Sequence, residues 1–332
     1  MDPLTDVRQI SSIAYGFIAS KTLFAALNLD LFSRLSPGGK TVTELAGEVE
    51  IPQHRLLTLL TACVSLGLIS QEQGRYANAP ASQAYLVRQA PAYFGDYFRF
   101  QIDRQIYPLL LNLDQALQGC APRNLYEQMN DPEEADYFTR AQHAGSLGPA
   151  AVLQKVADLS QARRMLDVAG GSGAFTIALC RRHPQLRATI VDFPAVIEVA
   201  KRFVREAGLD NRVDYISGDA VTQEWPRSQD VVLMSYLLSA VAGSAIGGLF
   251  TQAFHALEPG GRLLIHDFMA DDDRSGPRNA ALWFMTFLFD PDAVSFTPSE
   301  LIVFAEGAGF VDASVRDLIP GITRLLMARK PL

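Results

Sequence analysis

From about Arg163 onward, short apolar runs alternate with helical segments, and this alternation limits the chain to few folds. It predicts a parallel β-sheet with helices on both faces. The end of the chain breaks the pattern, because two apolar runs flank Pro320-Gly321 and predict an antiparallel hairpin that closes one sheet edge. The expected strands are 165–168, 188–191, 213–217, 231–234, 262–267, 311–318 and 322–329, and the expected helices lie near 174–182, 195–207, 245–257 and 298–308.

The first hundred residues predict helices and one hairpin. A helical pattern runs from Ile10 to Leu35, Thr43 is the expected N-cap of the next helix, and Pro52 starts an apolar helix that reaches about Leu66. Residues 71–77 predict a hairpin with a glycine at its tip. Two helices followed by a short wing outline a winged helix. One small wing cannot cover both the 10–27 helix and the 52–66 helix, so we expect this region to build a homodimer.

Length and charge narrow the class of protein further. A chain of 332 residues suits more than one domain, and we expect boundaries at 1–100 (winged-helix-like), 101–160 (helical connector) and 161–332 (Rossmann-like sheet). Cys63, Cys120 and Cys180 lie far apart without a CxxC pair, which predicts reduced cysteines and no metal site. A net charge of -7 disfavours nucleic acid as a partner. No signal peptide or uninterrupted apolar span is visible, so we expect a cytoplasmic protein without a membrane span.

A glycine-rich loop, Asp167–Gly173, lies between the first expected strand of the sheet and its helix. Its glycines let the backbone approach a ligand closely at a helix N-terminus. Asp192 ends the next strand, where a carboxylate can accept both ribose hydroxyls, and Asp219 ends the third, where it can contact an adenine amine. A plain tight turn is the alternative interpretation of the loop. A dinucleotide fingerprint fits less well, because residues 171–176 lack its third glycine.

The segments 167–173, 191–194, 218–219 and 257–267 together resemble the plant-type small-molecule O-methyltransferases, which include caffeic acid and hydroxyindole O-methyltransferases and bacterial antibiotic-tailoring enzymes. The resemblance covers nearly the whole chain, because this family also carries a winged-helix-like dimerisation domain. It implies S-adenosyl-L-methionine as the cofactor and a Rossmann-like class I sheet. The implied cofactor-binding residues are Asp167, Gly170, Gly171, Asp192, Asp219, Ala220, Ser235 and, on the segment 138–146, Ser146.

Two positions depart from the family pattern in the cofactor site. Ala169 stands where the family usually has its first glycine, and a methyl side chain is tolerable there if φ is negative. Ser235 stands where some members have a lysine that contacts the cofactor.

The catalytic pattern departs more strongly. Family members use a histidine just after the fourth strand of the sheet as the base, and Ser239 occupies that position here. Serine is not a base near neutral pH without a base of its own. Asp267 matches one of the family's two supporting carboxylates. The position of the other aligns near Ser295, so this chain lacks that carboxylate. In lacking this histidine, the chain resembles one relative, the bacteriochlorophyllide C-20 methyltransferase, which methylates carbon. That enzyme has a tyrosine at this position, which is also absent here.

The five histidines and Tyr236 are the other candidates for the general base. His143 lies one turn from Ser146 on the same expected helix and is the best alternative, ahead of Tyr236. His266 neighbours Asp267 on a strand and should be buried on the opposite face. The remaining histidines are expected in the N-terminal domain (His54) or at the surface (His183 and His255).

An aromatic stripe marks the expected acceptor pocket, which the connector should cover. Trp283, Phe284 and Phe287 lie on one helix before Asp290-Pro291-Asp292, where the family lines its acceptor site. Phe138, with Tyr97 and Phe98, is expected to join them, and Ser239 also borders the pocket. Such a stripe is also typical of plain core, and a mixed role is favoured.

These features predict a methyltransferase for an aromatic or pigment-like natural product. Either it methylates oxygen without the usual histidine base, or it methylates carbon, nitrogen or sulfur, where no strong base is needed. Two other classes stay open. A winged-helix regulator that senses a ligand is disfavoured, because its recognition helix would offer only His54 and Arg55 as basic side chains. A cofactor-binding protein without transfer activity is the other.

Overall fold

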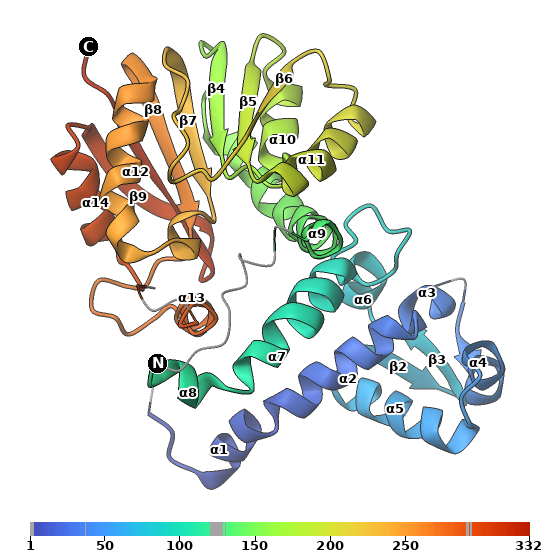
Figure 1. Cartoon of the computed structure of the whole chain (residues 1–332). Coiled ribbons are helices and arrows are strands. Elements are labelled where there is room, and N and C mark those ends of the chain that lie inside the picture. The colour runs from blue at the N-terminus through green and yellow to red at the C-terminus, as the bar shows by residue number, and fades with distance from the viewer. Residues whose placement is uncertain (1–2, 37, 120–128, 130, 290–291, 293) are drawn as a thin grey trace. The chain divides into compact units, whose positions relative to one another are not determined.

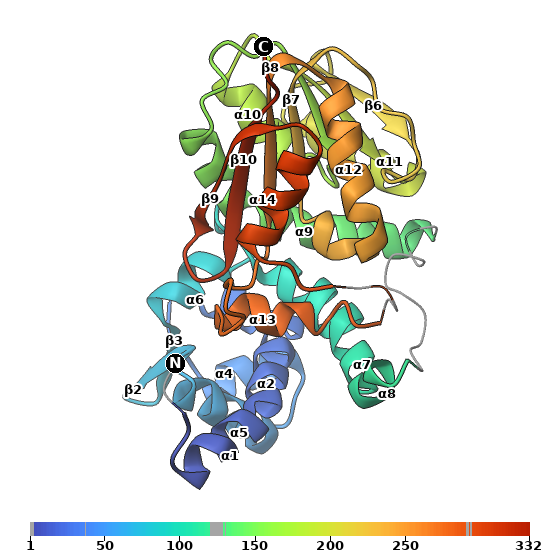
Figure 2. The same cartoon turned by 90° about the vertical axis from the view of Figure 1, so that its left-hand side faces the viewer.

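The computed structural model describes residues 3–36, 38–119, 129, 131–289, 292 and 294–332. The chain divides into two compact units, Met1–Arg104 and Gln105–Leu332 (Figures 1 and 2). Cys120 and the turn residues Asp290 and Pro291 lie outside the described residues. The three domain boundaries expected from the sequence stay a prediction.

The N-terminal unit is a small helical fold with a three-stranded sheet in the order β1-β3-β2. Gln73 and Gly74 both have positive φ (49° and 76°), so the hairpin between β2 and β3 turns with the twist that antiparallel strands prefer. Its elements are α1 (Val7–Ala14), α2 (Gly16–Asn28), α3 (Leu31–Leu35), β1 (Lys40–Thr41), α4 (Val42–Val49), α5 (Gln53–Ser65), β2 (Ile69–Glu72), β3 (Arg75–Asn78) and α6 (Pro80–Tyr85); the π-helix η1 (Tyr97–Ile106) follows.

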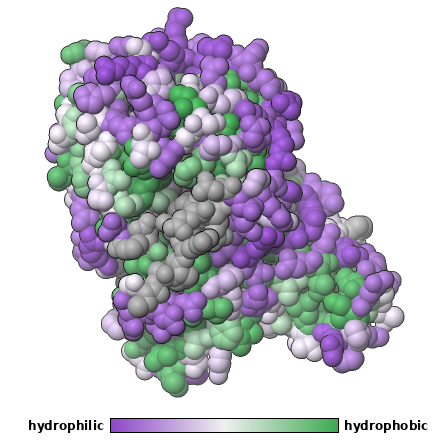
Figure 3. Space-filling view, viewed as in Figure 1, coloured by the Kyte–Doolittle hydropathy of each residue, from purple (hydrophilic) through white to green (hydrophobic). Residues whose placement is uncertain are grey.

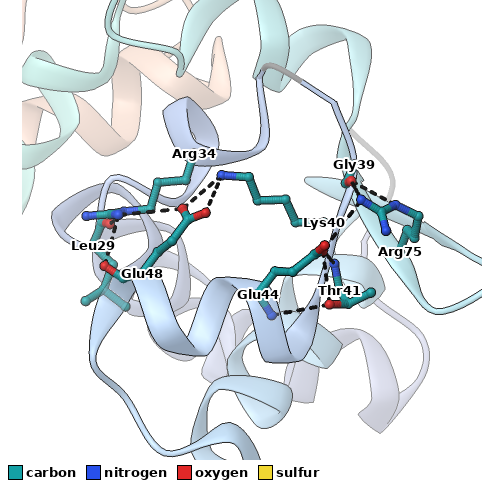
Figure 4. A network of polar contacts seen from close by, with 8 residues as sticks. All are labelled: Leu29, Arg34, Gly39, Lys40, Thr41, Glu44, Glu48 and Arg75. Carbon is teal, nitrogen blue, oxygen red and sulfur yellow. Dashed lines mark hydrogen bonds and ion pairs between the residues drawn. The ribbon is translucent and has the colours of Figure 1, made fainter.

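Thr41, and not Thr43, is the N-cap of α4. Its hydroxyl accepts from the Glu44 amide at 3.2 Å, and Glu44 Oε2 accepts from the Thr41 amide at 2.6 Å. The prediction of Thr43 was wrong because a Glu three residues after Thr41 completes a capping box, which binds two amide donors at once. Figure 4 shows this box beside a second group, in which Lys40 Nζ contacts Glu48 Oε1 at 2.7 Å.

The first two helices leave much apolar surface uncovered within the chain. Helix α1 has no buried residue, and Val7, Ile13 and Phe17 are 72%, 62% and 55% exposed. Figure 3 shows green, hydrophobic side chains at the surface of the N-terminal unit. Among the described residues, the stretch Val7–Asn28 passes a length and hydropathy test for a membrane span, with 17% of its apolar window buried. That is weak support for a span, because the polar residues Ser20, Lys21 and Thr22 interrupt it.

The C-terminal unit is a seven-stranded sheet in the order β6-β5-β4-β7-β8-β10-β9. Neighbouring strands from β6 to β8 are parallel, and β10 pairs antiparallel with β8 and β9. The fold class predicted from the sequence, with its terminal hairpin, is therefore confirmed. The strands are β4 (Arg164–Val168), β5 (Arg187–Asp192), β6 (Val213–Ser217), β7 (Gln229–Ser235), β8 (Leu257–Asp267), β9 (Val311–Ile319) and β10 (Thr323–Arg329).

Helices cover both faces of the sheet (Figure 1). From β4 the chain adds β5 and β6 on one side, and it then crosses back to add β7 and β8 on the other side, so right-handed connections place their helices on opposite faces. Side chains of α9, α10 and α11 form one buried cluster with Met165 of β4. Those of α12 and α14 form another with Leu166 and Val168, as expected when side chains alternate along a strand. The helices are α7 (Tyr107–Leu110), α8 (Leu113–Leu117), α9 (Pro132–Val156), α10 (Ala174–Arg182), α11 (Pro194–Glu206), the 3₁₀ turn η3 (Leu238–Ala240), α12 (Gly243–Ala256), α13 (Arg278–Phe284) and α14 (Pro298–Gly307).

Strand β8 begins at Leu257, five residues before the predicted start at Arg262. Gln229 pairs with Leu257 and Val231 with Arg262, so the four residues 258–261 of β8 lie opposite the single residue Asp230 of β7 in this register shift. Gly260 has φ 80° there, a conformation that glycine adopts without strain.

Candidate functional site

The loop after β4 has a left-handed backbone at three positions. Ala169, Gly171 and Gly173 have φ values of 52°, 56° and 75°. The condition for a tolerable alanine is therefore not met, because Ala169 carries its methyl group in the region that favours glycine. A Cβ at Gly170 would lie 2.8 Å from Asp167 Cγ and 3.0 Å from Ile190 Cγ2, so this glycine allows the loop to lie close to the side chains of β4 and β5.

Asp192, at the end of β5, holds the glycine loop from one side. Its Oδ2 accepts from the Gly171 amide at 2.8 Å, and its Oδ1 accepts from the Phe193 amide at 2.8 Å. Burial raises the pKa of Asp192 to about 6, although both amide bonds act in the opposite direction. The structure thus brings together the loop and the acidic residue that the sequence placed at neighbouring strand ends.

Asp167, in β4, is a second buried carboxylate beside the loop. Its Oδ2 accepts from Thr176 Oγ1 at 2.6 Å, whereas its buried Oδ1 has no hydrogen-bond partner among the described residues. Burial, opposed in part by the Thr176 bond, raises the pKa of Asp167 to about 7. An unpartnered buried carboxylate oxygen fits a site that receives a donor from a ligand.

Asp219 and Ala220 lie just beyond the end of β6. Asp219 is exposed, and its Oδ1 accepts from the Val221 amide at 2.9 Å. Ala220 is buried, and its carbonyl accepts from Trp225 Nε1 at 2.9 Å. These bonds order the turn at a third parallel strand end, the edge where open α/β sheets bind ligands.

Helix α9 contacts the glycine loop through His143. Nδ1 of His143 lies 2.9 Å from Ser172 Oγ, and the ring stacks on Phe203 of α11 with a centroid separation of 3.8 Å. Burial lowers the pKa of His143 to about 4. Ser146, one turn further along α9, is buried at 7% exposure, and Phe138 lies half-buried near the start of this helix.

His266, in β8, is fully buried, as the sequence predicted. Nδ1 lies 2.9 Å from Ser235 Oγ and Nε2 lies 2.9 Å from Thr323 Oγ1, so both ring nitrogens have partners. Burial lowers the pKa of His266 to about 3. The prediction that His183 lies at the surface was wrong: it is 9% exposed, because the chain turns back after α10 and Arg212 donates to its carbonyl at 3.2 Å.

Ser239, in the η3 turn after β7, and Asp267, at the end of β8, form a buried pair. The Ser239 hydroxyl donates to Asp267 Oδ1 at 2.6 Å, and the Ser239 amide donates to Oδ2 at 3.1 Å. The Phe268 amide also donates to Oδ1 at 2.8 Å. Burial, partly offset by these bonds, raises the pKa of Asp267 to about 6.

A row of aromatic rings runs from this pair to α13. Tyr236 contacts Phe268 at 5.3 Å between centroids, Phe268 stacks on Trp283 at 5.1 Å, and Trp283 meets Phe287 at 6.4 Å. Tyr236 has φ 58°, an uncommon value for a non-glycine residue. The predicted stripe is therefore divided, because Phe284 turns into the core against Phe296.

Tyr97 and Phe98 have ring contacts with Phe94 inside the N-terminal unit.

Several residues of the site were not predicted from the sequence. Ser172 was visible inside the glycine motif, and Phe268 directly follows Asp267. Phe203 and Thr323 carried no local signal.

Comparison with known proteins gives the family. A model of the O-methyltransferase domain matches residues 117–311, and a model of the O-methyltransferase dimerisation domain matches residues 11–88. The chain belongs to the plant-type O-methyltransferase family. Members of this family are S-adenosyl-L-methionine-dependent methyltransferases, and this chain is such an enzyme.

The chain has similar relatives among bacterial methyltransferases. It is 35% identical to the 3-hydroxy-5-methyl-1-naphthoate 3-O-methyltransferase of Streptomyces sahachiroi, over 94% of this chain and 92% of that one. It is 30% identical to the tetracenomycin polyketide synthesis 8-O-methyl transferase of Streptomyces glaucescens, over 100% of both. An N,N-dimethyltransferase of Streptomyces rimosus and an L-tyrosine C(3)-methyltransferase of Streptomyces lavendulae are 28% and 27% identical, over 93% and 83% of this chain and 92% and 79% of theirs.

Among solved structures, human N-acetylserotonin methyltransferase in complex with the cofactor is 25% identical, with a TM-score of 0.88 and 100% coverage of both chains. For the N-terminal unit, the match to a dimerisation domain favours a dimer contact over DNA recognition.

The residues of this methyltransferase fit the cofactor of the family. The unpartnered oxygen of Asp167 can accept a hydrogen bond, two buried carboxylates flank a loop with close backbone access, and the loop leads into a helix N-terminus. A cationic ligand with amine and hydroxyl donors matches this set.

Proposed function

We propose that this methyltransferase transfers the methyl group to a hydroxyl group of a small aromatic natural product. The aromatic row Tyr236–Phe268–Trp283–Phe287, which starts beside the Ser239–Asp267 pair, carries the proposal. Its rings form an apolar aromatic surface, in which Phe268 and Trp283 stack at an interplanar angle of 28°, and such a surface suits a planar acceptor. Two relatives at 30% identity or above are both named for oxygen methylation.

In this proposal the cofactor lies along the carboxyl ends of β4, β5 and β6. Its amino acid end is held by Asp167, the loop at Gly170 and Gly171, and Ser146, while Asp192 accepts the ribose hydroxyls. Asp219 and Ala220 border the adenine, and Ser235 lines the far side of the site. When bound, the cofactor supplies an electrophilic methyl group, which the acceptor oxygen takes as the carbon–sulfur bond breaks and its electron pair stays on sulfur.

The acceptor pocket is proposed to use Trp283 and Phe287, with Phe138 on α9 and Ser239 at its edge. Phe284 supports it from the core side. Asp267 acts by holding the η3 turn, because its carboxylate is occupied by the Ser239 hydroxyl and by backbone amides. These residues orient the acceptor and exclude water, which lowers the barrier to an in-line displacement.

Loss of the hydroxyl proton needs no side-chain base in this proposal. Ser239, the residue at the family's histidine position, donates a hydrogen bond to Asp267. His266 has partners on both nitrogens and His143 contacts Ser172. The acceptor therefore loses its proton to bulk water before it binds, and acceptors with acidic hydroxyls on fused or carboxylated rings should react best, because a larger fraction of them is ionised near neutral pH.

The test is transfer of a labelled methyl group to a panel of hydroxynaphthoates, naphthols, simple phenols, arylamines and alcohols. We expect transfer to rise as the acceptor's pKa falls toward the assay pH, with the methyl group on oxygen by NMR of the product. A methyl group on carbon or nitrogen would overturn oxygen transfer and support the alternative mechanisms. Binding of S-adenosylhomocysteine without transfer to any acceptor would support the non-catalytic alternative.

The same proposal includes a homodimer formed by the N-terminal unit and a cytoplasmic location. The exposed apolar face of α1 and the match to a dimerisation domain support the dimer.

A further inference from the structure

We propose that His143 is a positioning residue that fastens α9 to the glycine loop through Ser172 and thereby sets the affinity for the cofactor. The proposal rests on the assignment of the glycine loop as the cofactor site. It replaces the idea of His143 as a general base, which the sequence left open.

The first support is how the loop is held. Gly171 is bonded by Asp192 from the β5 side at 2.8 Å, and the next residue, Ser172, is contacted by His143 from the α9 side at 2.9 Å. Positive φ values at Gly171 and Gly173 give the loop a conformation that few side-chain-bearing residues support by themselves. Two successive residues bonded to different elements restrict it, so loss of one bond should loosen the backbone that faces the cofactor.

The second support is that His143 itself is fixed. Its ring is nearly parallel to the ring of Phe203, with an interplanar angle of 11°. The neighbouring residue, Arg202, forms an ion pair with Asp136 two turns earlier on α9. Helix α9 is thus tied to α11 at two points, and the imidazole has little freedom to swing toward an acceptor.

The third support is the charge state of the ring. Because burial lowers the pKa of His143 to about 4, the imidazole is neutral at physiological pH and adds no positive charge beside a cationic cofactor. A neutral imidazole with so low a pKa is also a weak base for a phenol. Both points favour a hydrogen-bonding role.

The fourth support is what α9 carries. Ser146 lies three residues after His143, on the same face of the helix, and is buried. Fastening α9 at His143 therefore places Ser146 against the cofactor site together with the loop. The bond between His143 and Ser172, 29 residues apart, therefore fixes both the glycine loop and the α9 side of the site.

The experiment is a double-mutant cycle on His143 and Ser172 in the full-length chain. S-adenosylhomocysteine affinity is measured by calorimetry, and kcat and KM for the cofactor are measured with an acceptor that the enzyme methylates. His143→Phe keeps a ring to stack on Phe203 but cannot bond Ser172, and Ser172→Ala removes the same bond from the other side. His143→Asn keeps a polar group near the position of Nδ1 and serves as the conservative variant.

We expect His143→Phe and Ser172→Ala each to weaken affinity roughly 3- to 10-fold, and the double variant to lose no more than the larger single effect, because one shared bond is lost. The value of kcat at saturating cofactor should stay within about twofold, and His143→Asn should recover part of the affinity. Ser172→Ala is a small change that should fold, and thermal unfolding of each variant checks this.

Additive losses in the double variant would overturn the proposal. A loss of kcat of about 100-fold in His143→Phe, with unchanged affinity and a silent Ser172→Ala, would overturn it in favour of a base. If Asp192→Ala also binds the ligand as wild type does, the cofactor-site assignment fails instead, and the two failures are distinguishable.

Discussion

The hydroxyl of Ser239 donates to Oδ1 of Asp267 across 2.6 Å, with both residues buried at 4% and 0% exposure. The Ser239 amide binds the other carboxylate oxygen at 3.1 Å. A serine whose proton points to a carboxylate is a donor in this arrangement, and the carboxylate is used to close the η3 turn onto β8. The pair therefore has the properties of a structural clasp at the acceptor site.

The first prediction is that Ser239→Ala retains most of the activity. The expected loss in kcat is less than about tenfold, since removal of a true general base costs about 10²–10⁴-fold. Single-turnover methyl transfer with a reactive acceptor measures it. A 100-fold loss for this variant would contradict the clasp interpretation and require a chemical role for the hydroxyl.

The second prediction concerns stability at the partner residue. Asp267→Ala leaves the buried amides of Ser239 and Phe268 without their acceptor and should lower the free energy of unfolding by about 1–3 kcal/mol. Asp267→Asn keeps an acceptor oxygen and should lose clearly less. Urea unfolding of both variants at pH 7 makes the comparison, and equal losses would show that the acceptor oxygens are unimportant.

The third prediction is that Asp192→Ala weakens S-adenosylhomocysteine binding roughly 10- to 150-fold, the equivalent of about 1.5–3 kcal/mol for lost hydrogen bonds to a charged group. Calorimetry measures the dissociation constant. Asp214→Ala, an exposed change on the neighbouring strand β6, is the matched control and should bind as wild type does. Unchanged binding in Asp192→Ala would refute the ribose assignment.

The fourth prediction is a pH dependence of the same binding reaction. Burial raises the pKa of Asp192 to about 6, and the ionised form is the one that accepts two hydroxyl donors. Affinity should therefore weaken as the pH falls below 6, approaching tenfold per unit from this group, while Asp167, with a pKa of about 7, adds a separate loss that begins at higher pH. In Asp192→Asn the dependence around pH 6 should disappear, and its persistence would assign the titration to another group.

The fifth prediction is that Ala169→Gly stabilises the protein by roughly 0.5–1 kcal/mol. The left-handed conformation costs a residue with a Cβ about 1–2 kcal/mol, while the added freedom of glycine in the unfolded chain returns about 0.4–1 kcal/mol. Ala79→Gly is the control, because Ala79 has φ -64° and gains nothing from glycine. Equal effects in the two variants, measured by urea unfolding, would show that the strain at Ala169 is negligible.

Much of the site could be predicted because its signals are local. Asp167, Asp192 and Asp219 each end or follow a strand, and parallel strands bring their carboxyl ends to one edge. The capping box at Thr41 and Glu44 was equally local and was missed, because Thr43 lies closer to the apolar pattern of the helix.

The aromatic stripe shows where local reading stops. Helical spacing places Trp283, Phe284 and Phe287 on neighbouring positions, but it cannot say which ring meets Phe268 and which turns toward Phe296. That choice depends on how α13 lies against β8 and the segment before α14.

The sequence by itself determined the seven-stranded α/β sheet with its terminal hairpin and the winged N-terminal unit, because periodicity is a property of short segments. The cofactor followed from the family resemblance that the glycine and carboxylate motifs carry. Only the tertiary structure decided that Ser239 is bound to Asp267, 28 residues away, and that His143 contacts Ser172, 29 residues away. It also decided the positive φ of Ala169 and the burial of His183. These features arise from packing between distant segments, whose geometry no short stretch of sequence contains.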